Sequence, residues 1–236
     1  MTIQKEVWVI LLLTILIGVA FVRFGKKIDA MDPMAKPEGK IVPVLLGVSY
    51  VHNTVKENCG EKVADKFTPY VIVLWLFIFL SNIISIFGLP SPTGTLSVTL
   101  TLSLVTWTLI QITEFKYGGV KAYFHSFLEP IPVMLPMNII GKFSMIISLS
   151  FRLFGNILCG GILMSLIYSA IGLLSNKLIG LVAGPGTYFN FLAPVIAPVF
   201  HAYFDLFSGF IQTLVFTTLT VVLVGNDIPE EYKKGN

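Results

Sequence analysis

The chain has 236 residues, of which 55% are hydrophobic and only 12% are charged, and its formal net charge is +3. A soluble domain carries about 25% charged residues, so this composition, with a mean hydropathy of +0.83, indicates an integral membrane protein. The small net charge and the lack of a basic run with interleaved aromatics argue against a nucleic-acid partner. Cys59 and Cys159 belong to no paired motif, so we expect neither a disulfide nor a metal site.

The first apolar segment, residues 7–24, predicts a retained membrane anchor. It is longer than the apolar region of a secretion signal, which has about 7–15 residues. Arg23, Lys26 and Lys27 stand at its end, where a signal peptide would have a small-residue cleavage site.

Residues 40–66 predict an amphipathic helix that lies on the membrane surface. Their apolar residues recur at helical spacing on one face, which consists of Ile41, Val44, Leu45, Val48, Val51 and Val55. The alternative is a small helix packed on its neighbours.

Residues 69–89 and 96–113 each come close to the about 20 residues that a membrane-spanning helix needs. The link between them, residues 90–95, is uncharged and rich in turn-forming residues. These two segments therefore predict a tight helical hairpin.

The last two apolar blocks, residues 131–176 and 189–224, are too long for simple spans. The first would measure about 69 Å as one helix, against an apolar bilayer core of about 30 Å. Each block either folds back on itself, with a bend available at residues 160–161, or forms a strongly tilted helix. Pro194 and Pro198 are expected to disrupt or delay the start of the last helix.

The distribution of basic residues predicts five crossings with the N-terminus outside and the C-terminus in the cytoplasm. With this orientation only Lys5 and Lys177 lie outside. The cytoplasmic residues are then Arg23, Lys26, Lys27, Lys36, Lys40, Lys56, Lys62, Lys66, Lys116, Lys121, Lys233 and Lys234.

Arg152 lies deep inside an apolar block in which Lys142 is the only other formal charge. A charged residue costs about 2.5–3.5 kcal/mol at the bilayer centre on insertion scales, and such residues are commonly functional. Helical spacing places it on one face with Gly141, Ser144, Ser148, Asn156 and Cys159. Small residues on such a face are also typical of simple helix packing, and for the two serines this alternative stays open.

The last block carries a second polar face, formed by His201, Asp205, Ser208 and Gln212 at spacings of four, three and four residues. These groups can accept, hold and pass protons, although His201 is equally suited to a plain interfacial position. Arg152 stays protonated in any protein environment, so it cannot relay a proton, but it can stabilise an approaching carboxylate and repel cations. The chain offers only Asp205 at that depth, which implies an acidic residue on a second subunit.

Three stretches of the chain resemble subunit a of the F-type ATP synthase: SFRLFGNI at 150–157, IQTLVFTTLT at 211–220 and LSVTLTL at 96–102. The likeness runs from about residue 69 to residue 224. It implies a fixed, non-catalytic subunit beside a rotating ring of hairpin subunits that carry mid-membrane carboxylates. Two aqueous half-channels, for H⁺ or Na⁺, would lead to this ring from opposite sides, and the two long helices would be strongly tilted.

The resemblance gives Arg152 the role of gate and barrier, places Gln212 beside it, and places Asn156 at the ring interface. It also implies peripheral-stalk partners and a bacterial plasma membrane. We divide the chain into an N-terminal anchor and surface helix, residues 1–67, and an ion-translocating domain, residues 68–236. We expect no cofactor.

Two positions depart from the family pattern. Many members have an acid where this chain has Gly161, and histidine or serine where it has Asp205. We therefore expect the outer ionisable group to lie on the last helix. Lys142 stands where some members have an acid; it would either alter the inner half-channel or, as we favour, meet lipid phosphates.

Two other classes of protein fit less well. A stand-alone secondary ion-coupled transporter would show a repeated half, and this chain has no internal repeat. An intramembrane hydrolase would need a motif such as HExxH or GxSxG, and the sequence contains neither.

Overall fold

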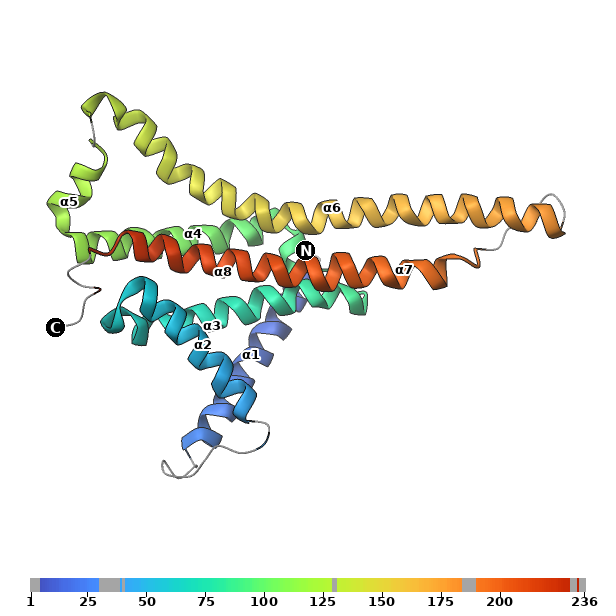
Figure 1. Cartoon of the computed structure of the whole chain (residues 1–236), viewed down its shortest axis with the longest axis horizontal. Helices are drawn as coiled ribbons and strands as arrows, with labels where there is room; N and C mark the ends of the chain where they lie inside the picture. Colours follow the sequence, from blue (N-terminus) through green and yellow to red (C-terminus); the bar gives the residue numbers. More distant parts are fainter. Residues whose placement is uncertain are drawn as a thin grey trace.

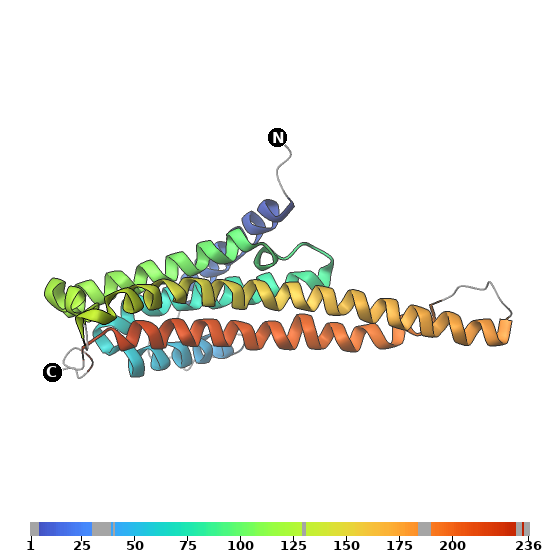
Figure 2. The same cartoon turned by 90° about the horizontal axis from the view of Figure 1, so that it is seen from above.

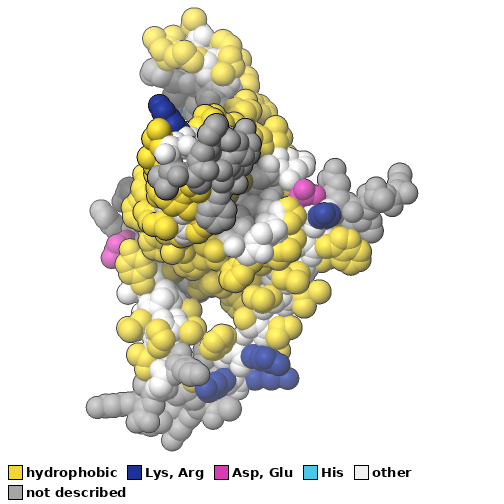
Figure 3. Space-filling view, turned by 90° about the vertical axis from the view of Figure 1, so that its right-hand side faces the viewer, with side chains coloured by type: hydrophobic (Ala, Val, Ile, Leu, Met, Phe, Trp, Pro, Cys, Tyr) yellow, Lys and Arg dark blue, Asp and Glu magenta, His cyan; other side chains and the backbone are white. Residues whose placement is uncertain are grey.

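The computed structural model describes residues 5–29, 39, 41–128, 131–183, 190–229 and 233, and all regular elements in these ranges are helices (Figure 1). Three basic residues used to predict the orientation lie outside the described residues, namely Lys36, Lys40 and Lys234. The same holds for Phe189, the first residue of the last apolar block. Within the described ranges, five apolar helical stretches are long enough to cross a membrane: Lys5–Lys27, Glu61–Phe87, Leu96–Gly118, Pro132–Leu181 and Ala193–Asn226. The predicted all-α membrane class is confirmed, and Figure 3 shows hydrophobic side chains over most of one end of the molecule.

Helix α1 (Lys5–Asp29) crosses the direction of the other long helices and packs on α3 (Glu61–Ile83) (Figure 1). The contact is apolar, because Val9 and Leu13 of α1 are buried beside Ile84.

A reversing link joins α3 and α4 (Leu96–Thr113) as predicted, but it begins after Ile83 and is longer than the expected residues 90–95. It consists of two short 3₁₀ turns, η1 (Ile84–Phe87) and η2 (Pro92–Gly94), with Gly88 at φ 73° between them. Glycine adopts this left-handed conformation without steric cost, so the chain can reverse there.

Helix α2 (Ile41–Cys59) is shorter than predicted, and the expectation of one helix reaching Lys66 is wrong. Gly60 has φ 85°, which interrupts the helix, and α3 begins at Glu61. The predicted apolar face does pack on α3 and α8 toward the end of α2, where Val55 is buried. Its placement on a bilayer surface stays a prediction.

Helix α4 continues into a wider π-helical segment, η3 (Glu114–Gly118), and α5 (Gly119–Ser126) follows. The short turn η4 (Pro132–Met134) leads into α6. Gly119 has φ 80° and separates η3 from α5.

Helix α6 (Leu135–Ala183) is one uninterrupted helix of 49 residues, about 73 Å long. The alternative in which this block folds back at residues 160–161 is therefore wrong. Because the apolar bilayer core is about 30 Å thick, a helix of this length and hydrophobicity fits only when strongly tilted.

The last block runs antiparallel to α6 as α7 (Ala193–His201), a π-helical segment η5 (Ala202–Phe207) and α8 (Ser208–Asn226) (Figures 1 and 2). Pro194 lies in the first turn of α7, as expected for a residue that delays helix formation. Pro198 lies inside α7 without ending it. The π-helical segment η5 begins four residues later, at Ala202.

Buried side chains hold these helices together in two main clusters. The first joins Leu149 and Leu153 of α6 to Phe216 of α8 and to Leu74 and Ile78 of α3. The second lies where α2, α3, α4 and the end of α8 meet; its members include Val55, Cys59, Val63, Phe67, Ile110, Val221, Val224 and Ile228. The predicted division after residue 67 falls inside α3 and stays a prediction about function.

Candidate functional site

The two predicted polar faces touch between α6 and α8 at Asn156 and Ser208. Ser208 donates a hydrogen bond of 2.6 Å to Oδ1 of Asn156, and a Cβ placed on Gly160 would lie 3.9 Å from Cβ of Phe204. One helical step of four residues from the Asn156–Ser208 contact, taken toward the start of α6 and the end of α8, reaches Arg152 and Gln212. The antiparallel register therefore places these two residues opposite each other.

Arg152 is held in place by its neighbours in the sequence. Leu149 and Leu153 are almost completely buried, and Ser150 lies 3.1 Å from the hydroxyl of Thr99 on α4. The side chain of Arg152 itself stays partly exposed, and within the described residues it makes no hydrogen bond or ion pair. A guanidinium without a counter-ion in the described part of the chain is thus presented at the α6 surface.

Two buried amide groups beside Arg152 also lack partners among the described residues. Nδ2 of Asn156 and Nε2 of Gln212 are inaccessible and make no hydrogen bond. Buried polar groups are almost always hydrogen-bonded, so each exception calls for an explanation. Both amides and the guanidinium are donors that lack an acceptor.

Toward the far end of α6, three side chains form a hydrogen-bonded chain. Nδ1 of His201 lies 2.7 Å from Oδ2 of Asp205, and Nε2 of His201 lies 2.9 Å from the hydroxyl of Tyr168. Both hydrogen bonds are satisfied when His201 carries its proton on Nδ1. The tyrosine hydroxyl then donates to Nε2, and Nδ1–H donates to the carboxylate. These two bonds join His201 to Asp205 and Tyr168, while its placement at a membrane interface stays an open alternative.

Ser148 lies on the predicted face, one turn before Arg152, and its side chain is exposed. The structure thus brings together Asn156 with Ser208 and His201 with Asp205, places Arg152 opposite Gln212, and leaves Ser148 on the open surface. Gly161, the other departure from the family pattern, has nothing within 4 Å of the position of a Cβ.

Asn82 supports the site from behind and was not predicted. This buried residue donates from Nδ2 to the carbonyl oxygen of Gly209 at 3.1 Å and accepts a bond of 2.9 Å from Thr93. It ties the hairpin link to the turn of α8 that precedes Gln212. An asparagine inside the apolar block 69–89 was the signal that could have revealed it.

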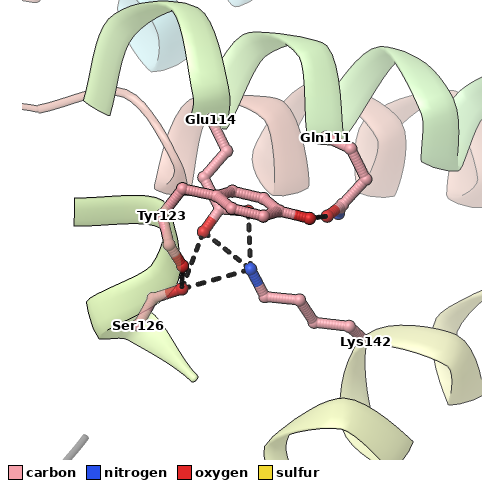
Figure 4. Close-up of polar contacts among 5 residues, drawn as sticks. All are labelled: Gln111, Glu114, Tyr123, Ser126 and Lys142. Atoms are coloured by element: carbon pink, nitrogen blue, oxygen red, sulfur yellow. Dashed lines mark hydrogen bonds and ion pairs between the residues drawn. The ribbon is translucent and has the colours of Figure 1, made fainter. Parts of the chain in front are cut away.

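Lys142 does not face lipid phosphates as we favoured. Its Nζ lies 2.6 and 2.7 Å from the two carboxylate oxygens of Glu114 and 3.2 Å from Oγ of Ser126 (Figure 4). The ring of Tyr123 covers the ammonium group, with its centroid 4.6 Å away. The protein itself supplies the counter-ion.

Comparison with known proteins decides the family. The model of the family described as ATP synthase A chain matches residues 7–225. The chain belongs to this family. It is an ion-translocating subunit a of the F-type ATP synthase membrane sector, with family members that serve H⁺ or Na⁺ enzymes.

Subunit a 2 of Acaryochloris marina is 29% identical over 200 residues, which cover 84% of this chain and 74% of that protein. Subunit a of Bacillus velezensis is 33% identical over 199 residues, or 78% of each chain. The sodium-ion-specific subunit a of Propionigenium modestum is 32% identical over 180 residues, or 69% of this chain and 55% of that protein.

Family membership settles the coarse function. Subunit a is a multi-pass membrane protein whose partners belong to the same membrane sector, and the two other classes considered from the sequence, a stand-alone transporter and a hydrolase, are set aside. Within the described residues, no cluster of histidine, cysteine or acidic side chains is arranged to hold a metal ion.

Proposed function

We propose that this subunit a forms two aqueous half-channels against a rotating ring of small hairpin subunits, with Arg152 as the gate between them. The observation that carries the proposal is the unpaired guanidinium on α6. A buried or half-buried charge without a partner is costly, so a carboxylate from another chain is the natural acceptor. The ring subunits, each with a mid-membrane carboxylate, would supply it.

The gate works by differential stabilisation of the ring carboxylate. When the carboxylate reaches Arg152, the positive charge favours its ionised form, and the bound ion leaves toward the half-channel on one side. Arg152 keeps its own proton and repels cations, which prevents a leak from one half-channel to the other. Gln212 stands beside Arg152, where its side-chain oxygen can accept a hydrogen bond from the guanidinium without neutralising its charge.

The outer half-channel would use Asp205 with His201 and Tyr168. A proton that enters these three hydrogen-bonded side chains at Tyr168 can leave at Asp205. The imidazole of His201 then changes from one tautomer to the other. The relay suits H⁺ as the coupling ion, because an imidazole hydrogen-bonded at both nitrogens can pass a proton from one partner to the other. Ser208 continues this path toward Asn156.

The inner half-channel would follow the exposed face of α6 from Arg152 past Ser148. This direction leads to the end of the bundle where Lys116 and Lys142 lie. We propose that this end faces the cytoplasm of a bacterium, with the N-terminus outside, because basic residues concentrate there. Peripheral-stalk subunits would contact the surfaces left free by the ring.

The deciding experiment measures ATP-driven ion pumping by the complete enzyme in liposomes, with and without sodium. We compare wild type with Arg152→Ala and use Arg23→Ala as the matched control, because these are the two arginines of the chain. We expect acidification by wild type and by the control in sodium-free medium, and none by Arg152→Ala.

Two results would change the proposal. Pumping by Arg152→Ala at the wild-type rate would show that the residue is structural and would remove the gate. Sodium uptake by the wild type, without acidification, would keep the gate and exclude the proton relay as the source of ion choice.

A further inference from the structure

The end of α3 and the turn η2 contact both α8 and α6 close to the hydrogen bond that joins these two long helices. On the α6 side, a Cβ placed on Gly94 of η2 would lie 3.2 Å from Cγ2 of Ile157, which directly follows the α6 partner of that bond. On the α8 side, Asn82 at the end of α3 reaches Gly209, which directly follows the α8 partner. Each long helix is therefore held at the residue next to their mutual contact.

The side chain of Asn82 binds one turn of α8 at two points. Its Nδ2 donates to the carbonyl oxygen of Gly209 at 3.1 Å and lies 3.4 Å from the hydroxyl of Thr213. These two residues are four positions apart, so they lie on one face of α8, and Gln212 belongs to the same turn. Two contacts on a single turn hold it at a set height and rotation, and with it the start of the Gln212 side chain.

The amide of Asn82 is itself held in place from the other side. Its Oδ1 accepts a bond of 2.9 Å from the buried hydroxyl of Thr93, which lies 2.9 Å from the hydroxyl of Ser91. Ser91 in turn donates a bond of 2.6 Å to the carbonyl oxygen of Ser81. The approach to α8 is also tight, because a Cβ on Gly209 would lie 2.9 Å from Cβ of Asn82. Displacing this amide is costly, since each lost bond leaves a buried polar group without a partner.

We propose that Asn82 is a positioning residue for ion translocation: together with η2 it braces α8 against α6 and so sets the place of Gln212 relative to Arg152. The brace is defined as Asn82 and η2. Small displacements of groups at a reacting site cost large factors in rate, so a loosened brace should slow pumping. The effect on pumping rests on the proposed function, whereas the brace itself does not.

The first measurement tests the brace without using ion transport. A Cβ on Gly160 would lie 3.9 Å from Cβ of Phe204, which is within the range for a disulfide, so Gly160→Cys with Phe204→Cys reports the register of the two helices. In the complete enzyme, with Cys159→Ser to remove a competing exposed thiol, we expect Asn82→Leu to slow cross-linking severalfold. The control Asn53→Leu makes the same change at an exposed position of α2. Equal cross-linking rates in these two variants would overturn the brace.

The second measurement is ATP-driven proton pumping by the complete enzyme without the added cysteines. We expect pumping to slow about tenfold in Asn82→Leu, and to slow similarly in Gly209→Ala, because the added methyl group pushes the turn away from Asn82. In a double-mutant cycle, Asn82→Leu should add little to the loss caused by Gln212→Ala, since both remove the same placement. Additive losses would make Asn82 a merely structural residue.

A third variant keeps the size and shape of the side chain and serves where Asn82→Leu fails to assemble. Asn82→Asp can donate to Gly209 only when its carboxyl group is protonated, so its cross-linking and pumping rates relative to wild type should fall as pH rises. Rates that stay equal to wild type at every pH would overturn the role of this bond.

The two measurements separate the brace from the proposed function. Slower cross-linking in Asn82→Leu with unchanged pumping would overturn the positioning role. Normal pumping by Arg152→Ala would instead contradict the proposed gate, and the cross-linking test of the brace would stay valid.

Discussion

Ser208 donates a hydrogen bond of 2.6 Å to Oδ1 of Asn156, and this contact joins the two long helices one turn away from Arg152 and Gln212. Nδ2 of the same asparagine is buried and has no hydrogen-bond partner among the described residues. The single contact through Oδ1 therefore ties α6 to α8 one turn from the arginine.

Removing this contact should have a small effect on stability and a larger effect on function. Ser208→Ala is expected to lower stability by about 0.6 kcal/mol, the average for such bonds between membrane helices. Ion pumping should fall more than this suggests, because the register at Arg152 loosens. Thermal unfolding of the purified subunit and pumping by the complete enzyme measure the two effects, with Ser169→Ala, on the exposed side of α6, as control.

The relay predicts a specific role for the hydroxyl of Tyr168. Tyr168→Phe keeps the ring and removes the bond to His201, worth about 0.5–1.5 kcal/mol, so proton pumping should slow by up to about tenfold. The control Tyr203→Phe changes an exposed ring of η5. Equal pumping rates for the two variants would exclude Tyr168 from the relay.

The Glu114–Lys142 pair predicts strongly non-additive effects. Lys142→Met leaves a carboxylate that is 11% exposed without its cation, which should cost about 3–5 kcal/mol. The double variant Glu114→Leu, Lys142→Met should recover most of this loss, since an apolar pair replaces the ions. A double-mutant cycle on thermal unfolding measures the coupling, and additive losses would contradict a buried pair.

Asp227 predicts that stability falls as pH rises. Its pKa is raised from 3.8 to about 6 by folding, so the folded state binds the proton more tightly, and stability decreases between these two values and stays lower above them. Asp227→Asn should therefore raise Tm at pH 7.5 by up to a few degrees, with a difference that disappears near pH 4. A variant that is no more stable than wild type at pH 7.5 would mean that the carboxylate is well solvated.

Gly225 predicts a steric limit where α8 meets the end of α2. A Cβ at this position would lie 2.6 Å from the backbone oxygen of Asn58, so Gly225→Ala should cost about 1–3 kcal/mol by overpacking. Gly180→Ala is the control, because nothing lies within 4 Å of a Cβ there. Thermal unfolding of both variants compares them, and equal Tm values would contradict the close approach.

Much of this protein follows from its sequence alone, because apolar length and charge position are properties of the chain itself. Composition alone shows Arg152 inside an apolar block and the turn residues between α3 and α4. Helical periodicity then gives the two polar faces. The family motifs around Arg152 and Gln212 are equally local.

Tertiary structure decided what depends on neighbours that are distant in the sequence. The end of α2 at Gly60 was misjudged, because helical periodicity continues through a residue whose backbone angle breaks the helix. Whether residues 131–176 fold back or form one helix depended on packing against α8, where Leu149 and Leu153 meet Phe216. The partners of Lys142 and His201, namely Glu114 and Tyr168, lie 28 and 33 residues away, and only the meeting of separate helices brings such groups within hydrogen-bonding distance.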